Sequence, residues 1–186
     1  AVATGPYPKE SWAYDPSIAP SPHDPDVAKA LLAEAGWMDH DGDGWLDRSG
    51  QPFRFTLLTN QGNEVRRQVS EIVQQHLKAV GIDVKIKIIE WSTFVHEFID
   101  KRRFEAVLLG WSLSRDPDLY DLFHSSKTRE GEYNFVGYAS PEVDRLLIEG
   151  RRIFGQEERQ RIYQQVHRHL ADDQPYTFLY VPDALP

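Results

Sequence analysis

Three stretches of the chain carry hydrophobic patterns that are typical of β-strands. Residues 52–60 alternate at first and then become apolar at Leu57 and Leu58, which predicts a strand. Residues 82–91 alternate cleanly, and their apolar side chains share one face of the predicted strand: Ile82, Val84, Ile86 and Ile88. Residues 104–111 are apolar without alternation, which predicts a central strand that is covered on both faces.

Helical patterns separate these strands. Residues 64–80 place apolar side chains at helical spacing between the first two strands, and residues 92–103 predict a short helix before the third. A strand, a helix and a strand over this length form a βαβ unit, so the first two strands should be parallel with a right-handed crossover. The order predicts an α/β fold with a mixed, mostly parallel sheet flanked by helices.

The second half of the chain predicts two longer helices. Ser140 and Pro141 are typical of an N-cap and a first helical turn. Residues 156–171 form a last helix, whose apolar stripe is expected to include Ile162, Tyr163, Val166, His169 and Leu170. The remaining expectations are a short helix or turn at 119–124, a closing strand at 175–181 and no element at 182–186.

The first 25 residues are rich in proline, with Trp12 and Tyr14 between the prolines. Because proline fixes φ and removes a hydrogen-bond donor, we predict an extended arm over residues 1–25 that lies across a surface and builds no core of its own. A single α/β lobe is predicted over residues 26–186. Its first helix should be capped by Asp24 and end at Gly36.

Composition narrows the classes of partner. The formal net charge is −8, and the basic residues are scattered over separate predicted helices, which argues against a nucleic-acid partner. No apolar run approaches the roughly 20 residues that a membrane-spanning helix requires. The chain has no cysteine, so disulfides and thiol chemistry are excluded.

An acidic, glycine-rich loop follows the first helix. Asp39, Asp41, Asp43 and Asp47 stand at positions one, three, five and nine of a calcium-loop pattern, with Gly44 at the sixth. The glutamate that such loops carry at position twelve is replaced by Gly50. Two interpretations remain open: a structural calcium site that braces the loop, and an acidic turn that binds no metal.

The case for an enzyme rests on Asp116 and Asp118, which flank Pro117. On an extended segment these carboxylates point the same way, so a paired acid/base site is one interpretation. The other is that one aspartate caps the following helix while its neighbour faces solvent. No H-E-x-x-H, G-x-S-x-G or glycine-rich phosphate loop occurs in the chain. We therefore expect no enzyme.

The case for a binding protein rests on aromatic residues beside polar loops. Trp91 and Trp111 each stand at the end of a predicted strand, and Tyr120 follows the polar loop 112–118. Ligands of open α/β sheets bind beyond the carboxyl ends of the strands. These aromatics suit a cleft that holds an extended, amphipathic ligand, although tryptophans that simply seal the edge of the sheet would show the same pattern.

Four blocks of sequence resemble a known family. DPDVAKALLAEAGWMDHDGDGWLD, FTLLTNQGN, GWSLSRDPDLYDLFHSS and YNFVGYASPEVDRLL are similar, in order and spacing, to family 5 extracellular solute-binding proteins, the oligopeptide- and dipeptide-binding subunits of ABC importers. The resemblance covers nearly the whole chain. It implies a type II periplasmic-binding fold in which two lobes close on a peptide, and it identifies this chain as a fragment that contains the carboxyl-terminal lobe.

The resemblance also implies partners and a location. The ligand would be a peptide or another small solute, and the partners would be the importer's permease and the amino-terminal lobe of the same protein. The full-length protein would be periplasmic or extracellular and membrane-associated as a lipoprotein. Two alternatives stay open: a sensor module that controls a regulator, and a binder of a non-peptide solute such as a sugar or a metal chelate.

Trp91 and Trp111 resemble the aromatics that line the family's peptide cleft. The best-known peptide binders place an aspartate for the ligand's α-amine where this chain has Ser114, and some have an arginine where it has Leu108. The amine would then be met by Asp116 or Asp118, by the amino-terminal lobe, or by nothing. The further candidates from this lobe are Asn60 and Asn63 of the turn before the second predicted helix, and Tyr120.

Overall fold

The computed structural model describes residues 1–182, and the chain forms two compact units. Unit 1 combines Ala1–Pro22 with Ser112–Pro186, and unit 2 is His23–Trp111. This division differs from the predicted arm over 1–25 and single lobe over 26–186. Within the described part of the chain, no helix is both long enough and apolar enough to cross a bilayer.

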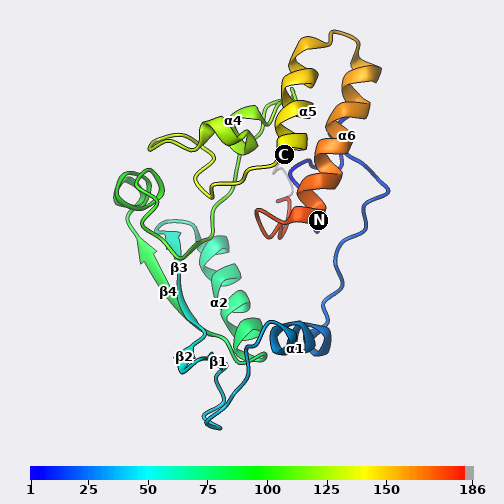
Figure 1. Cartoon of the computed structure of the whole chain (residues 1–186). Helices are drawn as coiled ribbons and strands as arrows, with labels where there is room; N and C mark the ends of the chain where they lie inside the picture. The colour runs from blue at the N-terminus through cyan, green and yellow to red at the C-terminus, as the bar shows by residue number, and fades with distance from the viewer. Residues whose placement is uncertain (183–186) are drawn as a thin grey trace. The chain divides into compact units, whose positions relative to one another are not determined.

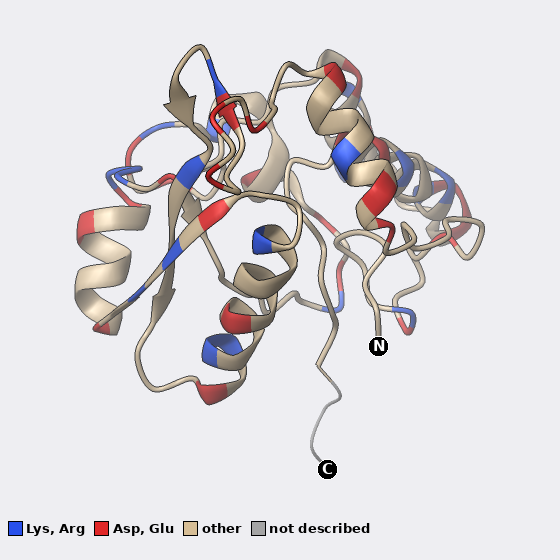
Figure 2. Cartoon of the chain, turned by 90° about the horizontal axis from the view of Figure 1, so that it is seen from below, with Lys and Arg blue, Asp and Glu red and all other residues tan. Residues whose placement is uncertain are grey.

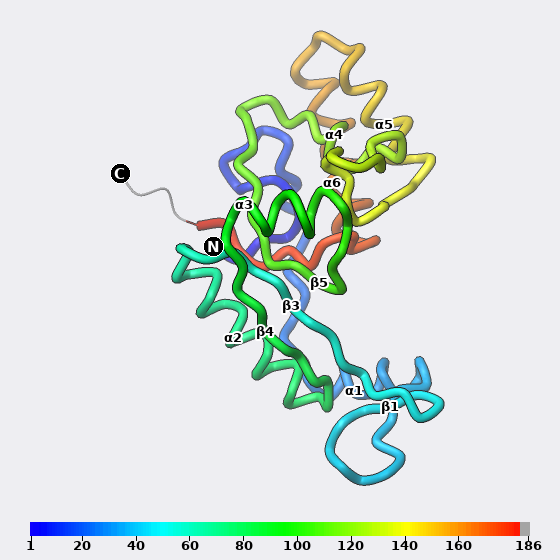
Figure 3. The backbone as a smooth tube through the Cα atoms, turned by 90° about the vertical axis from the view of Figure 1, so that its left-hand side faces the viewer, coloured from blue at the N-terminus to red at the C-terminus, as the bar shows by residue number. Residues whose placement is uncertain are grey.

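Unit 2 is built around a parallel three-stranded sheet (Figure 3). Its strands are β3 (Arg54–Asn60), β4 (Asp83–Ile89) and β5 (Ala106–Val107), in the order β4-β3-β5. Helix α2 (Glu64–Lys78) connects β3 to β4 and packs against both strands. The predicted βαβ unit with two parallel strands is confirmed.

The prediction of a central strand at 104–111 was wrong. In this structure β3 is the central strand, while β5 is two residues long and pairs with β3 alone in the sheet. Leu108 and Leu109, which follow it, are only partly buried. An apolar run indicates burial but does not tell a central strand from an edge strand, and that ambiguity caused the error.

Two details of the neighbouring elements also differ from prediction. Ile88 is exposed and Ile89 is buried, so the regular alternation of β4 breaks at its last two residues. The helix predicted over 92–103 begins earlier, as α3 (Trp91–Thr93), and continues as one π-helical stretch, η1 (Phe94–Ile99). Glu90 accepts hydrogen bonds from the backbone N–H groups of Ser92 and Thr93, which caps the helix directly at the end of the strand.

The first helix of unit 2 forms as predicted. Helix α1 (Pro25–Glu34) is capped by Asp24, and Gly36 follows it with a positive φ. After it come the acidic loop and the short antiparallel pair β1 (Asp47–Arg48) and β2 (Gln51–Pro52). One core cluster of unit 2 contains buried Leu57, Val80, Ile82 and Val84, with partly buried side chains from α1 and α2 packed against them.

Unit 1 is mainly helical. It contains α4 (Tyr120–Phe123), the 3₁₀ turn η2 (Ser125–Lys127), α5 (Pro141–Arg152) and α6 (Gln156–Asp173). Helices α5 and α6 pack side by side (Figure 1), and charged residues of both signs are spread along the helices (Figure 2). The buried stripe of α6 includes His167 rather than the predicted His169. His167 follows Val166 directly, and it meets the N-terminal segment described next.

Part of the segment 1–22 is buried in the core of unit 1, whereas the prediction placed the whole segment on a surface. Tyr7 and Ala13 are buried in the same cluster as Leu146, Val166 and Leu170. The backbone N–H of Asp15 donates to Nδ1 of His167 at 3.1 Å. Proline prevented regular secondary structure in this segment, but it did not prevent burial.

The closing strand predicted at 175–181 does not form. This stretch makes a single antiparallel bridge, between Tyr180 and Val2. The N–H of Val181 donates to the carbonyl of Ala1 at 2.9 Å, and the N–H of Ala3 donates to the carbonyl of Leu179. The pairing therefore stays too short for a strand. We also predicted that residues 182–186 form no helix or strand. Residues 183–186 lie outside the described residues.

Candidate ligand-binding site

The eight predicted ligand-binding residues are divided equally between the units. Asn60, Asn63, Trp91 and Trp111 belong to unit 2, and Ser114, Asp116, Asp118 and Tyr120 belong to unit 1.

In unit 2 the predicted residues follow the carboxyl ends of three parallel strands, which meet at one edge of the sheet. Asn60 ends β3 and is in register with Ile89, the last residue of β4. On the other side, the hydroxyl of Thr59 donates to the carbonyl of Leu108, just beyond β5, at 3.2 Å. Trp91 and Trp111 come two residues after Ile89 and three after Leu108 respectively. Asn60 and both tryptophans therefore belong to the edge at which α/β sheets bind ligands.

Both tryptophans at this edge of the sheet expose part of their side chains to solvent. Trp91 is 50% exposed and Trp111 is 38% exposed. Trp91 is the first residue of α3, and its ring lies 6.1 Å from that of Phe94. Exposed aromatic rings of this kind offer flat, amphipathic surface to a ligand.

The two asparagines already have structural roles in this unit. Asn60 is buried, and its side-chain oxygen accepts a hydrogen bond from Nη1 of Arg66 at 2.7 Å. The side chain of Asn63 caps α2 by accepting from the backbone N–H of Arg66 at 2.9 Å. Asn60 orders the end of β3, and Asn63 orders the start of α2.

Arg66 also belongs to this edge, although the sequence pattern did not indicate it. Its Nη2 lies so near Gly110 that a Cβ added there would be 3.2 Å away. The neighbouring Arg67 instead forms ion pairs with Glu64 and Glu71 on the surface of α2. The sequence shows only two adjacent arginines in a helix. Successive residues of a helix point in directions about 100° apart. This geometry alone could have shown that the two arginines face different surroundings.

In unit 1 the loop after Trp111 is ordered by its own polar side chains. The Ser114 hydroxyl donates to the carbonyl of Asp116 at 2.8 Å. The Asp116 carboxylate accepts from the N–H of Asp118, and the Asp118 carboxylate accepts from the N–H of Tyr120 at 3.0 Å. The Tyr7 hydroxyl donates to the buried carbonyl of Pro117 at 2.8 Å. The loop is thus a hydrogen-bonded turn that leads into α4.

Both aspartates of this loop also form ion pairs with arginines from the α5–α6 hairpin. Asp116 accepts from Nη2 of Arg159 at 3.0 Å, and Asp118 accepts from Nε of Arg151 at 2.7 Å. The hydrogen bond that Arg159 donates to Asp116 raises the pKa of Arg159. Burial lowers the pKa of Arg151, but the hydrogen bond and charge of Asp118 outweigh that effect and raise it. Each carboxylate therefore has a cationic partner within unit 1.

Tyr120 is held by neighbours on its ring and at its hydroxyl. The Arg151 guanidinium carbon lies 3.9 Å from the ring centroid, and the His124 ring stacks at 4.1 Å. The hydroxyl lies 3.3 Å from that of Ser126. Tyr120 and Asp118 thus share Arg151.

An open hollow of about 510 Å³ lies beside these ion pairs. Its lining residues are Ser114, Asp116, Asp118, Arg151, Ile153, Phe154 and Arg159. The structure therefore brings together three of the four predicted residues of unit 1, and Tyr120 stands behind Arg151. The hollow has hydrogen-bonding groups and one fully exposed ring, that of Phe154.

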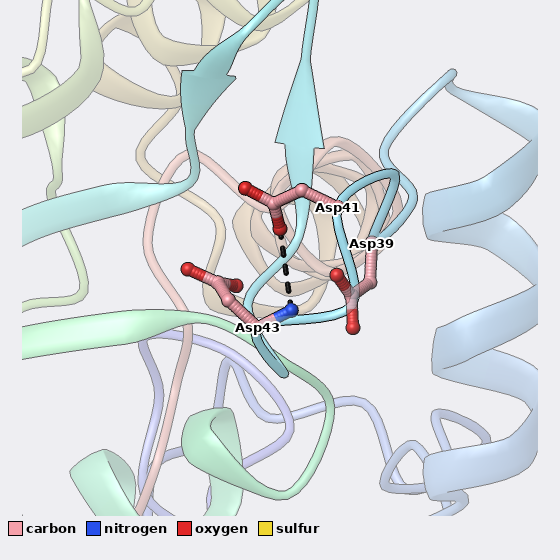
Figure 4. A group of neighbouring side chains, drawn as sticks. All are labelled: Asp39, Asp41 and Asp43. Carbon is pink, nitrogen blue, oxygen red and sulfur yellow. Dashed lines mark hydrogen bonds between the residues drawn. The ribbon is translucent and has the colours of Figure 1, made fainter.

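The acidic loop of unit 2 brings three of its four predicted ligands together. Oxygens of Asp39, Asp41 and Asp43 lie within 4.8 Å of one another (Figure 4). Asp47 is outside this group, and its carboxylate accepts from both the backbone and the ring of His40. The His40 backbone hydrogen bond, followed by the ring contact, lowers the pKa of Asp47. Each of the three grouped aspartates also accepts a hydrogen bond from a backbone N–H of the loop.

Comparison with known proteins places this chain among solute-binding proteins. The model of one family, described as bacterial extracellular solute-binding proteins, family 5 Middle, matches residues 1–133. The oligopeptide-binding protein AppA of Bacillus subtilis (strain 168) is 44% identical over 176 residues, which are 93% of this chain and 32% of AppA. The chain thus spans about a third of the length of this relative.

Solved structures agree with the sequence comparison. The structure of AppA from Bacillus subtilis in complex with a nonapeptide superposes with a TM-score of 0.90 at 44% identity, covering 98% of this chain and 36% of AppA. NikZ from Campylobacter jejuni in complex with Ni(L-His) gives a TM-score of 0.81 at 26% identity, covering 91% of this chain and 34% of NikZ. The predicted α/β fold of a periplasmic-binding-protein lobe is confirmed by these likenesses.

Proposed function

Because the chain belongs to the bacterial extracellular solute-binding proteins of family 5, we propose that it supplies one side of a site that captures oligopeptides for an ABC importer. The observation that carries the proposal is the 44% identity to AppA over 93% of this chain. The exposed Trp91 and Trp111 at the carboxyl edge of the unit 2 sheet support it, since aromatic walls suit an extended ligand.

The proposed mechanism is closure around the ligand. A peptide would bridge this part of the protein and the amino-terminal lobe, and the closed form would be presented to the permease. Binding through the peptide main chain would tolerate many side chains. In this proposal Trp91 and Trp111 contact the ligand, with Asn60 and Asn63 shaping the strand end beside them.

The ligand contacts predicted from unit 1 also stay proposals, and they have less support because their side chains already have partners within the unit. Asp116 and Asp118 would have to share their carboxylates with Arg159 and Arg151 in order to meet a ligand's amine. Sharing a carboxylate with an amine would weaken these largely exposed ion pairs, at a cost of about 0.5–1 kcal/mol each. Ser114 and Tyr120 would contribute only through the same loop.

Native mass spectrometry of the complete protein, purified gently from its host, tests the ligand class. A ladder of co-purifying masses that fragment as short peptides is the expected result. A single non-peptide mass would overturn the peptide assignment in favour of a solute such as a metal chelate. The NikZ structure with Ni(L-His) makes that second candidate concrete.

We propose no catalytic role for the Asp116/Asp118 pair. An acid/base pair needs carboxyl groups that can reach a substrate, whereas both aspartates already accept hydrogen bonds from arginines and from backbone N–H groups of their own loop. Incubating a peptide with the wild-type protein and with the double variant D116N/D118N tests this. Hydrolysis that is present in the wild type and lost in the variant would contradict the proposal.

Two further proposals concern the whole protein. Lipoprotein anchoring outside the cytoplasmic membrane is tested by metabolic labelling with a fatty acid, and a protein that incorporates no label would contradict it.

A sensor role in place of import would require a regulatory partner. Deleting the importer's permease genes distinguishes the two, because import stops whereas a sensor response persists.

The acidic loop is retained as a proposed calcium site with a bracing role. Extracellular calcium modules have dissociation constants of about 10⁻⁴ to 10⁻³ M, so 10 mM calcium would stabilise the loop by about 1.4–2.7 kcal/mol. The expected result is a higher melting temperature with calcium than with a chelator, and a smaller difference in D39N. An equal melting temperature under both conditions would contradict the proposal.

A further inference from the structure

Two adjacent arginines of α2 have different surroundings. Arg67 is on the surface of the helix, where Glu64 and Glu71 neutralise it and raise its pKa. Arg66 is partly buried and points to the carboxyl edge of the sheet. Within residues 1–182, no carboxylate lies within ion-pair distance of Arg66. The helix therefore presents one neutralised and one uncompensated guanidinium, side by side in sequence.

The Arg66 guanidinium lies between two strand ends. Its Nη1 donates to the side-chain oxygen of Asn60 at the end of β3. Its Nη2 lies beside Gly110, which follows β5 and has no side chain to push it away. A guanidinium carries five N–H donors, and Asn60 uses only one of them. Most of its hydrogen-bonding capacity is thus available at this edge.

Asn60 and Gly110 fix this arginine without neutralising it. The Asn60 side chain donates in turn to the carbonyl of Gln61 at 2.9 Å, which orients its oxygen toward Arg66. An amide oxygen carries no formal charge, so the cation keeps its full attraction for an anion. Trp111 follows Gly110 directly and is 38% exposed. An anion at Arg66 would have an aromatic wall close by in the chain.

From this arrangement we propose that Arg66 is a specificity-determining residue that binds a carboxylate group of the ligand. The planar fork of a guanidinium matches a carboxylate with two parallel hydrogen bonds, which an ammonium cannot do. The inference rests on the proposed function, because it assigns the chemical class of ligand group that this edge accepts. A peptide carries such a group at its C-terminus and on acidic side chains.

The test uses the complete protein that contains this chain, stripped of bound ligand, and four synthetic alanine-rich nonapeptides. One has a free C-terminal carboxylate and one a C-terminal amide. The other two are amides that carry a single central Glu or Gln. Titration calorimetry of all four peptides measures two preferences, acid over amide and Glu over Gln.

The wild-type protein is expected to show one of these preferences at about 10- to 100-fold, as hydrogen bonds to charged groups give. R66Q should abolish that preference, and R66K should retain part of it because the charge remains without the fork. R67Q is the matched control and should leave the preference unchanged. A preference for the free acid assigns the α-carboxylate as the partner, and a preference for Glu assigns a side chain.

Three results would overturn the inference while leaving the proposed function in place. They are peptide binding without either preference, equal losses for all four peptides in R66Q, and a preference that survives R66Q. Melting temperatures of R66Q and R66K show whether equal losses come from misfolding. If R66Q is misfolded, the two preferences are compared between the wild type and R66K instead. A wild-type protein that binds none of the peptides contradicts the proposed function itself, and the inference fails with it.

Discussion

The two units of this chain use their charged residues in opposite ways. In unit 1, Asp116 and Asp118 are paired with Arg159 and Arg151, so the loop after the third strand is fastened to the α5–α6 hairpin. In unit 2, Arg66 stands at the carboxyl edge of the sheet with an amide as its partner. Neutralised pairs brace a structure, whereas an uncompensated charge at the strand ends is, in the proposed function, available to a ligand.

The units also differ in how the chain builds them. Unit 2 is one continuous segment of the chain, so the helices and strands that pack together in it are close in sequence. Unit 1 joins residues 1–22 to residues more than 100 positions later, and its core depends on that contact. The first two predictions below test this dependence, and the remaining two test the charges.

The largest effect is expected from G5A. A Cβ at Gly5 would lie far inside contact distance of the buried His167 ring. Because overpacking of a buried site typically costs about 1–3 kcal/mol, we expect the free energy of unfolding of unit 1 to fall by about 3 kcal/mol. Hydrogen exchange read separately for the two units should show the loss in unit 1 alone.

Gly155 offers the control for that experiment, since nothing lies within 4 Å of a Cβ there. G155A should lower stability by less than about 1 kcal/mol, the scale of a changed helix cap. If G5A removed protection from both units equally, the two would unfold as one cooperative body. That result would contradict the division of the chain into two independently stable units.

The second prediction is a pH dependence confined to unit 1. Burial lowers the pKa of His167 to about 4 from 6.5, although the charge of Asp15 opposes the shift. Between these values the unfolded chain binds a proton that the folded unit excludes, so stability falls as pH drops from about 6.5 to 4, by up to about 3 kcal/mol. Urea unfolding at several pH values measures the slope.

H167Q removes the titrating ring, so it should flatten this slope even though it lowers stability at neutral pH. H169Q is the control on the same helix and should keep the slope. Asp15 affects stability in a different, lower pH range. Burial alone would raise its pKa, but hydrogen bonds from Ser17 and Arg168 lower it from 3.8, so its contribution is lost only below that value. A slope that survives H167Q would show that another group is responsible.

The sequence predicted most of unit 2 because its signals are local. The βαβ unit follows from the hydrophobic period, and Asp24 caps the first helix as its position suggested. The short edge strand β5 was missed because an apolar run reports burial and not the order of strands in a sheet. The core role of residues 1–22 was missed because it depends on partners distant in sequence.

Site residues were predictable by position but not by role. Trp91 and Trp111 follow strands at the edge that the pattern indicated, and whether they touch a ligand stays a prediction. The ion pairs of Asp116 and Asp118 were invisible because their arginines come from helices more than 30 residues later. Arg66 was overlooked because its surroundings are set by how the helix turns against the sheet.

The third prediction concerns the ion pairs of unit 1. If Asp116 and Asp118 brace the loop, D116N and D118N should each lower stability by about 0.5–1 kcal/mol, as exposed pairs do, and should leave peptide affinity nearly unchanged. Urea unfolding and calorimetry with the same peptide measure the two quantities. A large loss of affinity without loss of stability would instead make these carboxylates ligand contacts and would erase the difference between the units.

The smallest effect is expected from G110A. A new Cβ would lie 3.2 Å from Nη2 of Arg66, so the guanidinium must move by a few tenths of an ångström. That shift would misalign the fork without removing its charge, and we expect about a two- to threefold weaker affinity for carboxylate-bearing peptides, or about 0.5 kcal/mol. Stability should hardly change, because the atom that must move is the far end of a side chain that is only partly buried. Combining G110A with R66Q gives the decisive comparison: once the guanidinium is gone, the added methyl group should have no further effect. If G110A still weakened binding in the R66Q background, Gly110 would contact the ligand directly, and the charge of Arg66 would not be what distinguishes this edge.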